Sequence, residues 1–554
     1  MRNNPLIIAL IAAVLALHLS CRNSETPFNG QDIKRAERLF GLSFSNEDID
    51  TILPYLQRNL EGYDSMRQFS LDREVMPAVL FNPVPQNFKY PQGTGQVSLE
   101  ETIDFEAPQD LDSLCFYPVW KLAHLIRNQK ISSTELTQHY LSRIKKYDKT
   151  LKAFITITEE LALEQAVKAD QELAQGLYRG PLHGIPYGLK DLIAVKGYPT
   201  TWGATPFQNQ QIDYSATVAI RLRKAGAVLL GKLSSGALAR GDVWFGGQTV
   251  CPWDTLIGAS GSSAGSAAAT AAGLVGFSLG TETMGSIMMP SARNGVTGLR
   301  PSFGTVSRQG VMTLAWSMDK IGPICRDALD CTLVYDVIHG YDPADPASNQ
   351  TPLIFDQSRQ LSDFRIGILT SEIEEDTTSG AENLRKILAF FDSINIPFVD
   401  KKLPEEMPFN AFDIILRSES GAFFDELIRS PEIDAMVQQD QRSRANSLRQ
   451  SRFIPAAEYL QANRFRTVLI NEMHQIFDDI DLLISPPAAE NQLSISNLCG
   501  IPSLSLPTGL DSLGHPTSMT VLADLYQEGI LLEFGQALQK ETSFHKKIPP
   551  DFFK

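Results

Sequence analysis

Cysteine and histidine are scarce in this sequence, and neither forms a pattern that binds a metal. The 554 residues include 6 cysteines and 8 histidines. No two cysteines are spaced as in CxxC, and there is no HExxH motif or histidine cluster, so we expect neither a metal nor another cofactor. A chain of this length can bury a large core without covalent cross-links, so we also expect no disulfide framework.

Positive charge is in short supply as well. Lysine and arginine number 49 against 64 aspartates and glutamates, which gives a net charge of −15. A strongly acidic chain binds a phosphate backbone poorly, so nucleic acid is excluded as the main partner. Apolar residues make up 43% and charged residues 20% of the chain, which is ordinary for a globular protein and excludes disorder throughout. We find no internal repeat.

Long apolar runs are absent except at the N-terminus. The run Leu6–Leu19 follows Arg2 and is too short for a comfortable membrane span, but it suits the hydrophobic region of a signal peptide. With Cys21 directly after it, the segment resembles a bacterial lipoprotein signal, although His18 departs from the usual aliphatic residue. We therefore expect residues 1–20 to be a signal peptide and Cys21 to carry a lipid that tethers an exported protein to the cell envelope. A secretory signal that releases a periplasmic protein, or an uncleaved anchor, is the alternative.

Residues 21–112 form an N-terminal extension that differs from the rest of the chain. Ser45 and Asp48 resemble a capping box at the start of a helix, and apolar residues then follow at helical spacing. Pro54 lies within this pattern, so we expect it to kink or shorten the helix. The proline-rich stretch 82–93 indicates an extended connector.

Residues 113–546 alternate between helical and strand-like patterns. Helices are expected over 132–147, 161–176 and 217–225, and strands over 153–157, 227–230, 364–369 and 482–485. This alternation predicts an α/β fold with a mixed or parallel sheet.

Two stretches of this region have the composition of a functional site. In Gly184–Asp191 a small apolar run carries Lys190 along a strand, although a lysine at a strand end more often reaches to water. The second stretch, Gly258–Gly298, is rich in glycine, serine and alanine, but its apolar part Ala267–Leu279 is unlike a flexible linker. It indicates either helices packed closely through small residues or a backbone brought close to a ligand.

Together these stretches resemble the amidase signature family. The family's lysine strand is matched by Gly184–Asp191, its glycine–serine loop by Ala259–Ser266, and its second serine segment by Gly280–Pro290. The resemblance covers roughly residues 115–545. It implies a mixed β-sheet surrounded by helices, no cofactor, and a triad of Lys190, Ser262 and Ser286 in which the peptide bond before Ser262 is cis.

The chemistry of an amidase explains why these residue types are needed. A serine hydroxyl such as that of Ser286 becomes a good nucleophile only when a base takes its proton, and Lys190 can be that base only if burial keeps it neutral. Ser262 would relay the proton. The resemblance implies that the backbone N–H groups of Thr283, Met284, Gly285 and Ser286 bind the oxyanion. We therefore predict an amidase that hydrolyses the carbon–nitrogen bond of a small linear amide, other than a peptide bond, through an acyl-enzyme.

Two residues depart from the family pattern and leave alternatives open. Met284 replaces a glycine and would be strained if its φ were positive. Met288 replaces an arginine that pairs with Glu282, for which Arg293 is a candidate substitute. An unpaired Glu282 would oppose catalysis, so a non-catalytic binding or scaffold protein is one alternative. The glutaminase subunit of a tRNA-dependent amidotransferase is another.

Several other motifs have competing interpretations. Gly261–Gly265 also fits the G-x-S-x-G elbow of α/β-hydrolases with Ser263 as nucleophile, but residues 251–254 and 258–259 before it look like loop rather than strand. Ser317–Lys320 fits S-x-x-K, and His183 is expected to be structural. The substrate-binding residues are not indicated by any motif, although we expect residues 370–480 to shape the pocket through four aromatic side chains: Phe412, Phe423, Phe424 and Tyr459. The sequence does not indicate an oligomeric state.

Overall fold

The computed structural model describes residues 28–69, 71–93, 97, 106–108, 110–487, 489 and 491–553. The predicted signal peptide and Cys21 lie outside these residues. Within them, no helix combines the length and the apolarity that a membrane crossing requires.

The chain divides into two compact units after Val75. The described part of the first unit holds α2 (Gly30–Ala36), a 3₁₀ helix η1 (Glu37–Phe40) and α3 (Asn46–Met66). The predicted capping box is present: Ser45 Oγ accepts from the Asp48 N–H at 3.1 Å, and the Asp48 carboxylate accepts from the Ser45 N–H at 2.9 Å. The helix runs through Pro54 for a further three turns, so the expected shortening is wrong.

The second unit begins with the proline-rich connector, which packs against the main body of that unit. The ring of Phe81 lies edge-on to Phe303 with 5.1 Å between centroids, and the guanidinium of Arg466 lies 3.4 Å from the centre of the Phe81 ring. These contacts hold residues 76–93 with the unit that carries the sheet.

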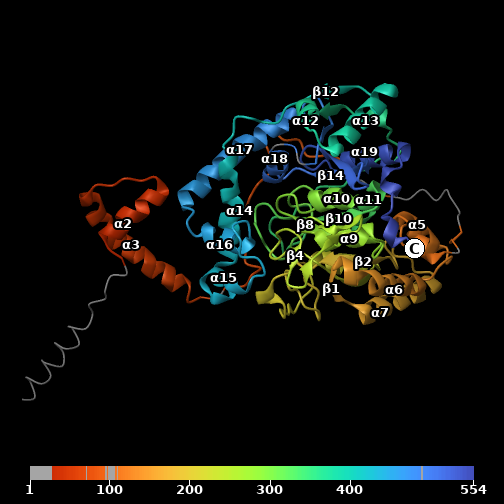
Figure 1. Cartoon of the computed structure of the whole chain (residues 1–554), viewed down its shortest axis with the longest axis horizontal. Helices are drawn as coiled ribbons and strands as arrows, with labels where there is room; N and C mark the ends of the chain where they lie inside the picture. The colour runs from red at the N-terminus through yellow and green to blue at the C-terminus, as the bar shows by residue number, and fades with distance from the viewer. Residues whose placement is uncertain are drawn as a thin grey trace, which may run out of the picture. The chain divides into compact units, whose positions relative to one another are not determined.

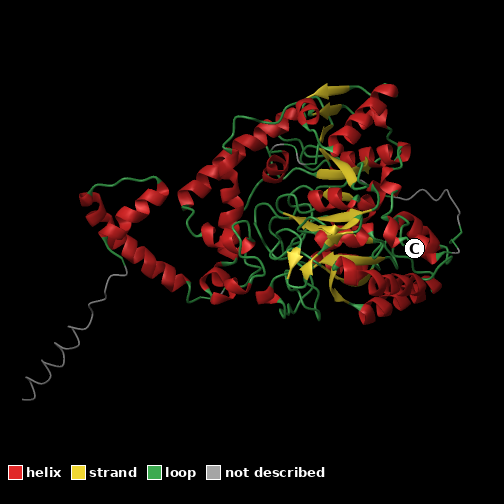
Figure 2. Cartoon of the chain, in the orientation of Figure 1, coloured by secondary structure: helices red, strands yellow, loops and turns green. Residues whose placement is uncertain are grey.

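An eleven-stranded mixed sheet runs through the second unit (Figure 2). In spatial order the strands are β1 (Phe154–Ile157), β3 (Val228–Leu233), β2 (Pro186–Lys190), β8 (Phe277–Glu282), β10 (Lys320–Cys325), β9 (Thr297–Arg300), β14 (Ser503–Leu510), β15 (Pro516–Leu522), β13 (Leu482–Ser485), β11 (Ile366–Ile368) and β12 (Phe398–Asp400). At one edge β1 pairs with β3 in antiparallel, and β3, β2 and β8 pair in parallel. The pairings from β8 through β10, β9, β14 and β15 to β13 are antiparallel, and β13, β11 and β12 at the other edge pair in parallel.

Helices surround this sheet, so the predicted α/β fold with a mixed sheet is confirmed (Figure 1). The central strands β2, β8 and β10 are buried along their whole length, as expected when both faces are covered. The α-helices are α4 (Leu111–Leu114), α5 (Val119–Arg127), α6 (Ser133–Leu151), α7 (Glu159–Ala174), α8 (Thr217–Lys224), α9 (Ala264–Ala271), α10 (Met288–Asn294), α11 (Ala328–Ile338), α12 (Thr370–Glu375), α13 (Ser379–Ser393), α14 (Phe409–Phe423), α15 (Asp425–Arg429), α16 (Arg444–Ser451), α17 (Ala456–Ile476), α18 (Gln492–Cys499) and α19 (Glu528–Glu541). Short 3₁₀ helices are η2 (Thr205–Phe207), η3 (Leu361–Asp363), η4 (Pro431–Ala435), η5 (Phe544–Lys546) and η6 (Pro550–Phe552).

Residues 251–254 and 258–259, before the glycine–serine loop, were expected to be loop, and this is wrong in part because Cys251, Asp254 and Gly258 belong to strands. Two small hairpins form there: β4 (Val243–Trp244) pairs with β5 (Gly247–Gln248), and β6 (Val250–Cys251) pairs with β7 (Asp254–Gly258). The indole N–H of Trp253, in the second turn, donates to the carbonyl of Asn294 at 2.8 Å. This tertiary contact stabilises a hairpin in which Leu256 is 93% exposed, so no apolar alternation marks it in the sequence.

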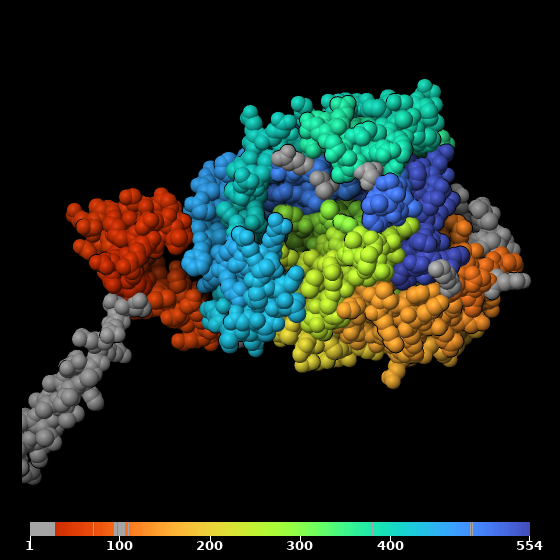
Figure 3. Space-filling model, viewed as in Figure 1, coloured from red at the N-terminus to blue at the C-terminus, as the bar shows by residue number. Residues whose placement is uncertain are grey.

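Three helices between β12 and β13 pack together beside the sheet. These are α14, α16 and α17, which lie next to one another in Figure 1. In the space-filling view of Figure 3, the surface is hollowed where the light-blue residues around α16 meet the green residues near the sheet. Residues of α14 and α16 line a pocket together with Gly261 and Ser286 from the sequence motifs.

Candidate active site

Lys190 ends strand β2 and lies wholly inside the protein. Its side chain has no exposed surface, so the alternative of a lysine that reaches to water is wrong. Its Nζ lies 2.8 Å from Ser262 Oγ, 3.0 Å from Ser263 Oγ and 2.9 Å from Thr281 Oγ1. The parallel pairing of β2 with β8 brings the ends of these strands together, so one amine meets three hydroxyl groups from two distant segments.

Burial sets the protonation of this lysine. Desolvation lowers the pKa of Lys190 well below its usual value of 10.5, and the charges of Asp319 and Glu282 offset only part of that effect. A neutral amine has a lone pair that can take a proton from a hydroxyl group. The side chain is therefore suited to act as a base rather than as a fixed positive charge.

Ser262 lies at the turn that leads into α9. The Gly261–Ser262 peptide bond is cis, as the family resemblance implies. At Gly261 a Cβ would lie 1.9 Å from the carbonyl oxygen of Gly241, so only glycine fits there. The side chain of Ser262 is buried and directed at Lys190.

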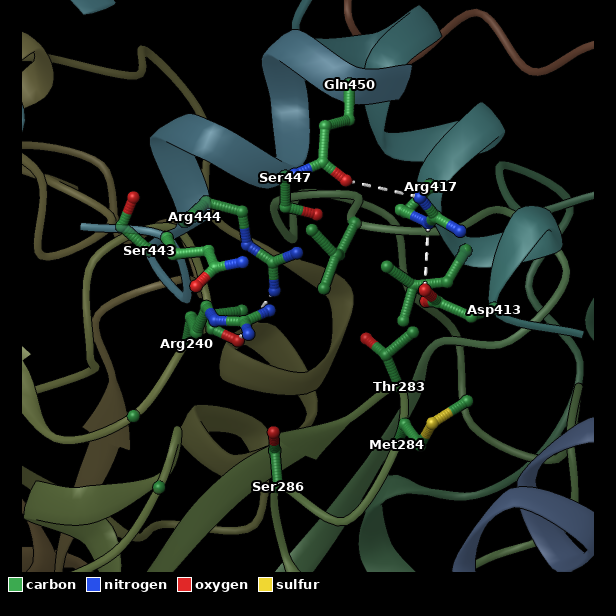
Figure 4. A pocket seen from close by; sticks show the side chains of 16 residues that line it. Arg240, Thr283, Met284, Ser286, Asp413, Arg417, Ser443, Arg444, Ser447 and Gln450 are labelled. Carbon is green, nitrogen blue, oxygen red and sulfur yellow. Dashed lines mark hydrogen bonds and ion pairs between the residues drawn. The ribbon is translucent and has the colours of Figure 1, made fainter. Parts of the chain in front are cut away.

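Ser286 lies in the turn between β8 and α10, and its hydroxyl group points into a pocket (Figure 4). The Ser263 N–H donates to the Ser286 carbonyl at 3.2 Å, which holds the two serine segments side by side. In the described part of the chain no hydrogen bond joins the hydroxyl groups of Ser286 and Ser262. The structure thus brings Lys190 and Ser262 into contact and leaves Ser286 facing the cavity.

The turn before Ser286 leaves several backbone donors unused. Among the described residues, the N–H groups of Thr283, Met284, Gly285 and Ser286 donate to no protein acceptor. Gly285 has a φ of +88°, whereas Met284 is not among the residues with positive φ. The strain foreseen for Met284 is therefore absent, and the free N–H groups are available to a developing oxyanion.

Glu282 is not an unpaired charge, and the cation that pairs with it is not Arg293, the candidate substitute. Arg300 from β9 lies 2.9 Å away, and both side chains are completely buried. The N–H groups of Ile287 and Met288 donate to the other carboxylate oxygen at 2.7 and 3.0 Å. Arg300 is 18 residues further along the chain and lies on β9, which β10 separates from β8 in the sheet, so the sequence pattern could not reveal this pairing.

We expect Glu282→Gln to destabilise the fold by about 3–5 kcal/mol, because it leaves the buried Arg300 without a counter-charge. Burial alone would raise the pKa of Glu282, but Arg300 and the two N–H groups outweigh it and lower the pKa from 4.5 to about 2. The stabilisation of the folded state by the ionised Glu282 carboxylate is therefore complete above pH 4.5, and it is lost as the pH falls towards 2. Urea unfolding across this range measures both effects.

A matched control for this variant is Glu382→Gln. Glu382 pairs with Lys386 at 2.8 Å on an exposed helix face, with both side chains about two-thirds exposed. The control should change the free energy of unfolding far less than Glu282→Gln does. Equal stabilities of Glu282→Gln and the wild type would contradict the structural role of the buried pair.

A second buried ion pair supports the lysine strand, and sequence reasoning gave it no role. Lys232 Nζ lies 2.7 Å from Asp191 Oδ1, and neither side chain is exposed. The other oxygen of Asp191 accepts from the Thr201 N–H at 2.8 Å. Because Asp191 follows Lys190 directly, this network fixes the end of β2.

The competing motifs are explained by packing. Ser263 Oγ is buried and donates to the Thr281 carbonyl at 3.1 Å, so it does not face the pocket as an elbow nucleophile would. In the S-x-x-K segment, Ser317 Oγ donates to Glu419 at 2.7 Å and Lys320 donates to the carbonyl of Met318. His183 is buried with Nε2 2.9 Å from the Ala169 carbonyl, a structural contact as predicted.

The pocket above Ser286 has a volume of about 370 Å³, and its walls are largely polar. The prediction that residues 370–480 shape it is confirmed, but the four aromatic residues named for that role do not line it. Phe412 and Phe424 are buried in a hydrophobic core, and Tyr459 donates to Glu419 at 3.0 Å. The residues that line the pocket are Ala239, Arg240, Gly241, Gly261, Thr283, Met284, Ser286, Leu314, Asp413, Leu416, Arg417, Gln441, Ser443, Arg444, Ser447 and Gln450.

Helix periodicity explains why the aromatic residues were the wrong choice. Leu416 and Arg417 follow Asp413 by three and four residues on α14 and so share with it the face that meets the pocket, whereas Phe412 is turned into the core. The polar residues of α14 and α16 had no motif to mark them. No group of residues able to hold a metal ion is found in the described part of the chain.

Comparison with known proteins defines the class of this molecule. The family model described as Amidase matches residues 135–496, more than half of the chain. The chain belongs to the amidase family.

Individual relatives extend this likeness over most of the chain. The Mycobacterium tuberculosis (strain ATCC 25618 / H37Rv) protein AmiD, which carries an amidase name, is 33% identical over 80% of this chain and 97% of its own length. A glutamyl-tRNA(Gln) amidotransferase subunit of Nitrosomonas europaea is 30% identical over 78% of this chain and 98% of its own. The structure of the peptide amidase from Stenotrophomonas maltophilia is similar with a TM-score of 0.65 at 29% identity, and the match covers 77% of this chain and 96% of that one. The molecule is thus an enzyme of the amidase class.

Proposed function

We propose that the protein hydrolyses the carbon–nitrogen bond of a small linear amide through an acyl-enzyme at Ser286. The observation that carries the proposal is the buried amine of Lys190, 2.8 Å from the hydroxyl group of Ser262, next to the pocket that Ser286 faces. Membership of the amidase family and relatives named as amidases support the reaction type.

In this mechanism Ser286 Oγ attacks the amide carbonyl carbon as Ser262 takes its proton and passes its own to Lys190. The step requires the Ser286 side chain to turn towards Ser262 when substrate fills the pocket. The oxyanion that forms accepts hydrogen bonds from the free N–H groups of the 283–286 turn, each of which contributes about 3–4 kcal/mol in comparable sites. The proton returns through Ser262 to the departing amine as the carbon–nitrogen bond breaks. Water then hydrolyses the ester on Ser286 by the same relay.

A serine-reactive phosphonate probe tests this assignment. Mass spectrometry of the labelled protein should place one adduct on the peptide that contains Ser286, and incubation with a library of small amides should protect that residue from labelling. An adduct on Ser262, Ser263 or Ser317 in place of Ser286 would contradict the assignment.

A glutaminase role is a second candidate, and it is favoured by the likeness to the amidotransferase component of Nitrosomonas europaea. A glutaminase would release ammonia from glutamine rather than hydrolyse a range of amides. Turnover of glutamine that greatly exceeds that of simple amides would favour this role. A scaffold role was suggested by Met284 and Met288, but the Glu282–Arg300 pair and the backbone at Met284 remove both of its reasons.

We also propose that the protein is exported and anchored to a membrane by a lipid on Cys21, on the evidence of the sequence alone. Metabolic labelling with an alkyne fatty acid should mark the wild type and place it in the membrane fraction. Cys21→Ser should lose the label and leave that fraction. Membrane attachment that persists in Cys21→Ser would indicate an uncleaved anchor.

A further inference from the structure

The pocket above Ser286 is positively charged, although the chain as a whole carries a net charge of −15. Three arginines, Arg240, Arg417 and Arg444, line it together with a single acidic residue, Asp413. A concentration of one charge inside a cleft attracts ligands of the opposite charge and orients them. The arginines do not all have the same role.

Arg417 is already neutralised within the pocket wall. Its Nε lies 2.8 Å from Asp413 one turn earlier on α14, and its Nη1 lies 3.4 Å from the side-chain oxygen of Gln450 (Figure 4). This pair of opposite charges leaves two arginines to account for the excess positive charge.

Arg444, the first residue of α16, is held in place by hydrogen bonds from two of its three guanidinium nitrogens. Its Nε donates to the carbonyl of Leu238 at 3.0 Å, and its Nη2 donates to that of Ala239 at 3.2 Å. Its Nη1 is buried and has no hydrogen-bond partner among the described residues. A buried charged donor without a partner is costly, so a ligand that supplies an acceptor there gains a strong interaction.

Arg240 places a second guanidinium beside Arg444 on the same side of the cavity, as Figure 4 shows. In the described part of the chain Arg240 has no carboxylate within ion-pair distance. Burial lowers the pKa of Arg444 to about 9, and the neighbouring charge of Arg240 contributes in the same direction. The two positive charges repel each other, and an anion between them removes that repulsion.

We propose that Arg240 and Arg444 bind a carboxylate of the substrate, so that the preferred substrates are amides that carry a carboxylate group in addition to the scissile amide. The inference rests on the proposed reaction at Ser286, which lines the same pocket. The planar guanidinium of Arg444, oriented by two carbonyls, presents Nη1 to one carboxylate oxygen, and Arg240 reaches the group from the solvent side.

The test compares monoamides of dicarboxylic acids with the corresponding diamides, for example glutaramic acid with glutaramide. The wild type should have a kcat/KM at least about tenfold higher for the acid than for the diamide. Arg240→Gln and Arg444→Gln should each remove this preference, because kcat/KM falls for the acid and changes little for the diamide. Arg240→Lys should retain part of it, since the charge remains.

Arg449→Gln is the matched control. Arg449 lies on the same helix α16, but it pairs with Asp434 at 2.6 Å on the surface and does not line the pocket. The variant changes the net charge equally and should keep the preference for the acid. If Arg444→Gln fails to fold, the result with Arg240→Gln is sufficient to test the inference. The side chain of Arg240 is exposed, so its replacement leaves no buried gap.

A binding measurement separates this inference from the proposed reaction. Calorimetry on Ser286→Ala needs no turnover and should show that glutaramic acid binds more tightly than glutaramide. In the double variant that combines Ser286→Ala with Arg240→Gln, this difference in affinity should disappear. Equal binding of the two compounds overturns the inference even if Ser286 is labelled and diamides are hydrolysed. Selective binding of the acid without any turnover by the wild type upholds the carboxylate site and overturns the proposed reaction instead.

Discussion

Replacing Ser286 by alanine is expected to lower kcat for amide hydrolysis by about 10⁶-fold, as in other enzymes whose serine nucleophile acts together with its base. In the proposed mechanism this change removes the atom that forms the acyl-enzyme and leaves the lysine relay without a substrate-facing partner. Ser286 is half-buried at the edge of the pocket, so the free energy of unfolding should change by less than about 1 kcal/mol. Steady-state kinetics and urea unfolding of the purified variant check the two expectations.

The control for this experiment is Ser393→Ala. The hydroxyl group of Ser393 is exposed and bonds only locally, to the carbonyl of Phe390 at 2.7 Å, near the end of α13. This variant should turn over amides at the wild-type rate. If Ser286→Ala kept a kcat close to that of the control, the nucleophile would be another residue.

Replacing Lys190 by arginine or methionine is expected to lower kcat by about 10²–10⁴-fold, the contribution of a general base. Arginine stays protonated, so it cannot accept the serine proton. Methionine fills much of the same volume without any base. Both variants should react with a serine-directed phosphonate at neutral pH far more slowly than the wild type does. An unchanged labelling rate in Lys190→Met would refute the relay.

The pH dependence gives an independent measure of the same residue. Because the base must be deprotonated, kcat/KM of the wild type should rise with pH and level off well below 10.5, the usual pKa of lysine. That rise should be absent in Lys190→Met. Just below pH 10.5 the amine of residue 190 is protonated in the unfolded chain but not in the folded one. The free energy of unfolding of the wild type should therefore rise with pH in this interval, and more steeply than that of Lys190→Met.

The parts of the molecule that could be predicted are those whose signals are local. The capping residues Ser45 and Ser132 each bond to the third residue of the helix they begin, so three or four neighbouring residues were enough to locate α3 and α6. Pro54 was a misleading local signal, because an exposed helix continued past it. The strand that carries Lys190 was recognisable because buried parallel strands are continuous apolar runs.

The pocket was hard to predict because its walls come from segments far apart in the sequence. Arg240 lies in a loop and Arg444 begins a helix about two hundred residues later, and the two meet because Arg444 bonds to the carbonyls of Leu238 and Ala239. Aromatic residues of α14 and α17 looked like pocket residues, but large apolar side chains gain most by burial and lie in the core.

The sequence by itself determined the family and the α/β fold, and it predicted the candidate triad of Lys190, Ser262 and Ser286, since each depends on residue type and spacing within short segments. Only the tertiary structure decided which charges are matched. It paired Glu282 with Arg300, neutralised Arg417 with Asp413, and left Arg240 and Arg444 facing the cavity. The physical reason is that desolvation and Coulomb interactions depend on distance in space and on burial, and neither follows from position along the chain.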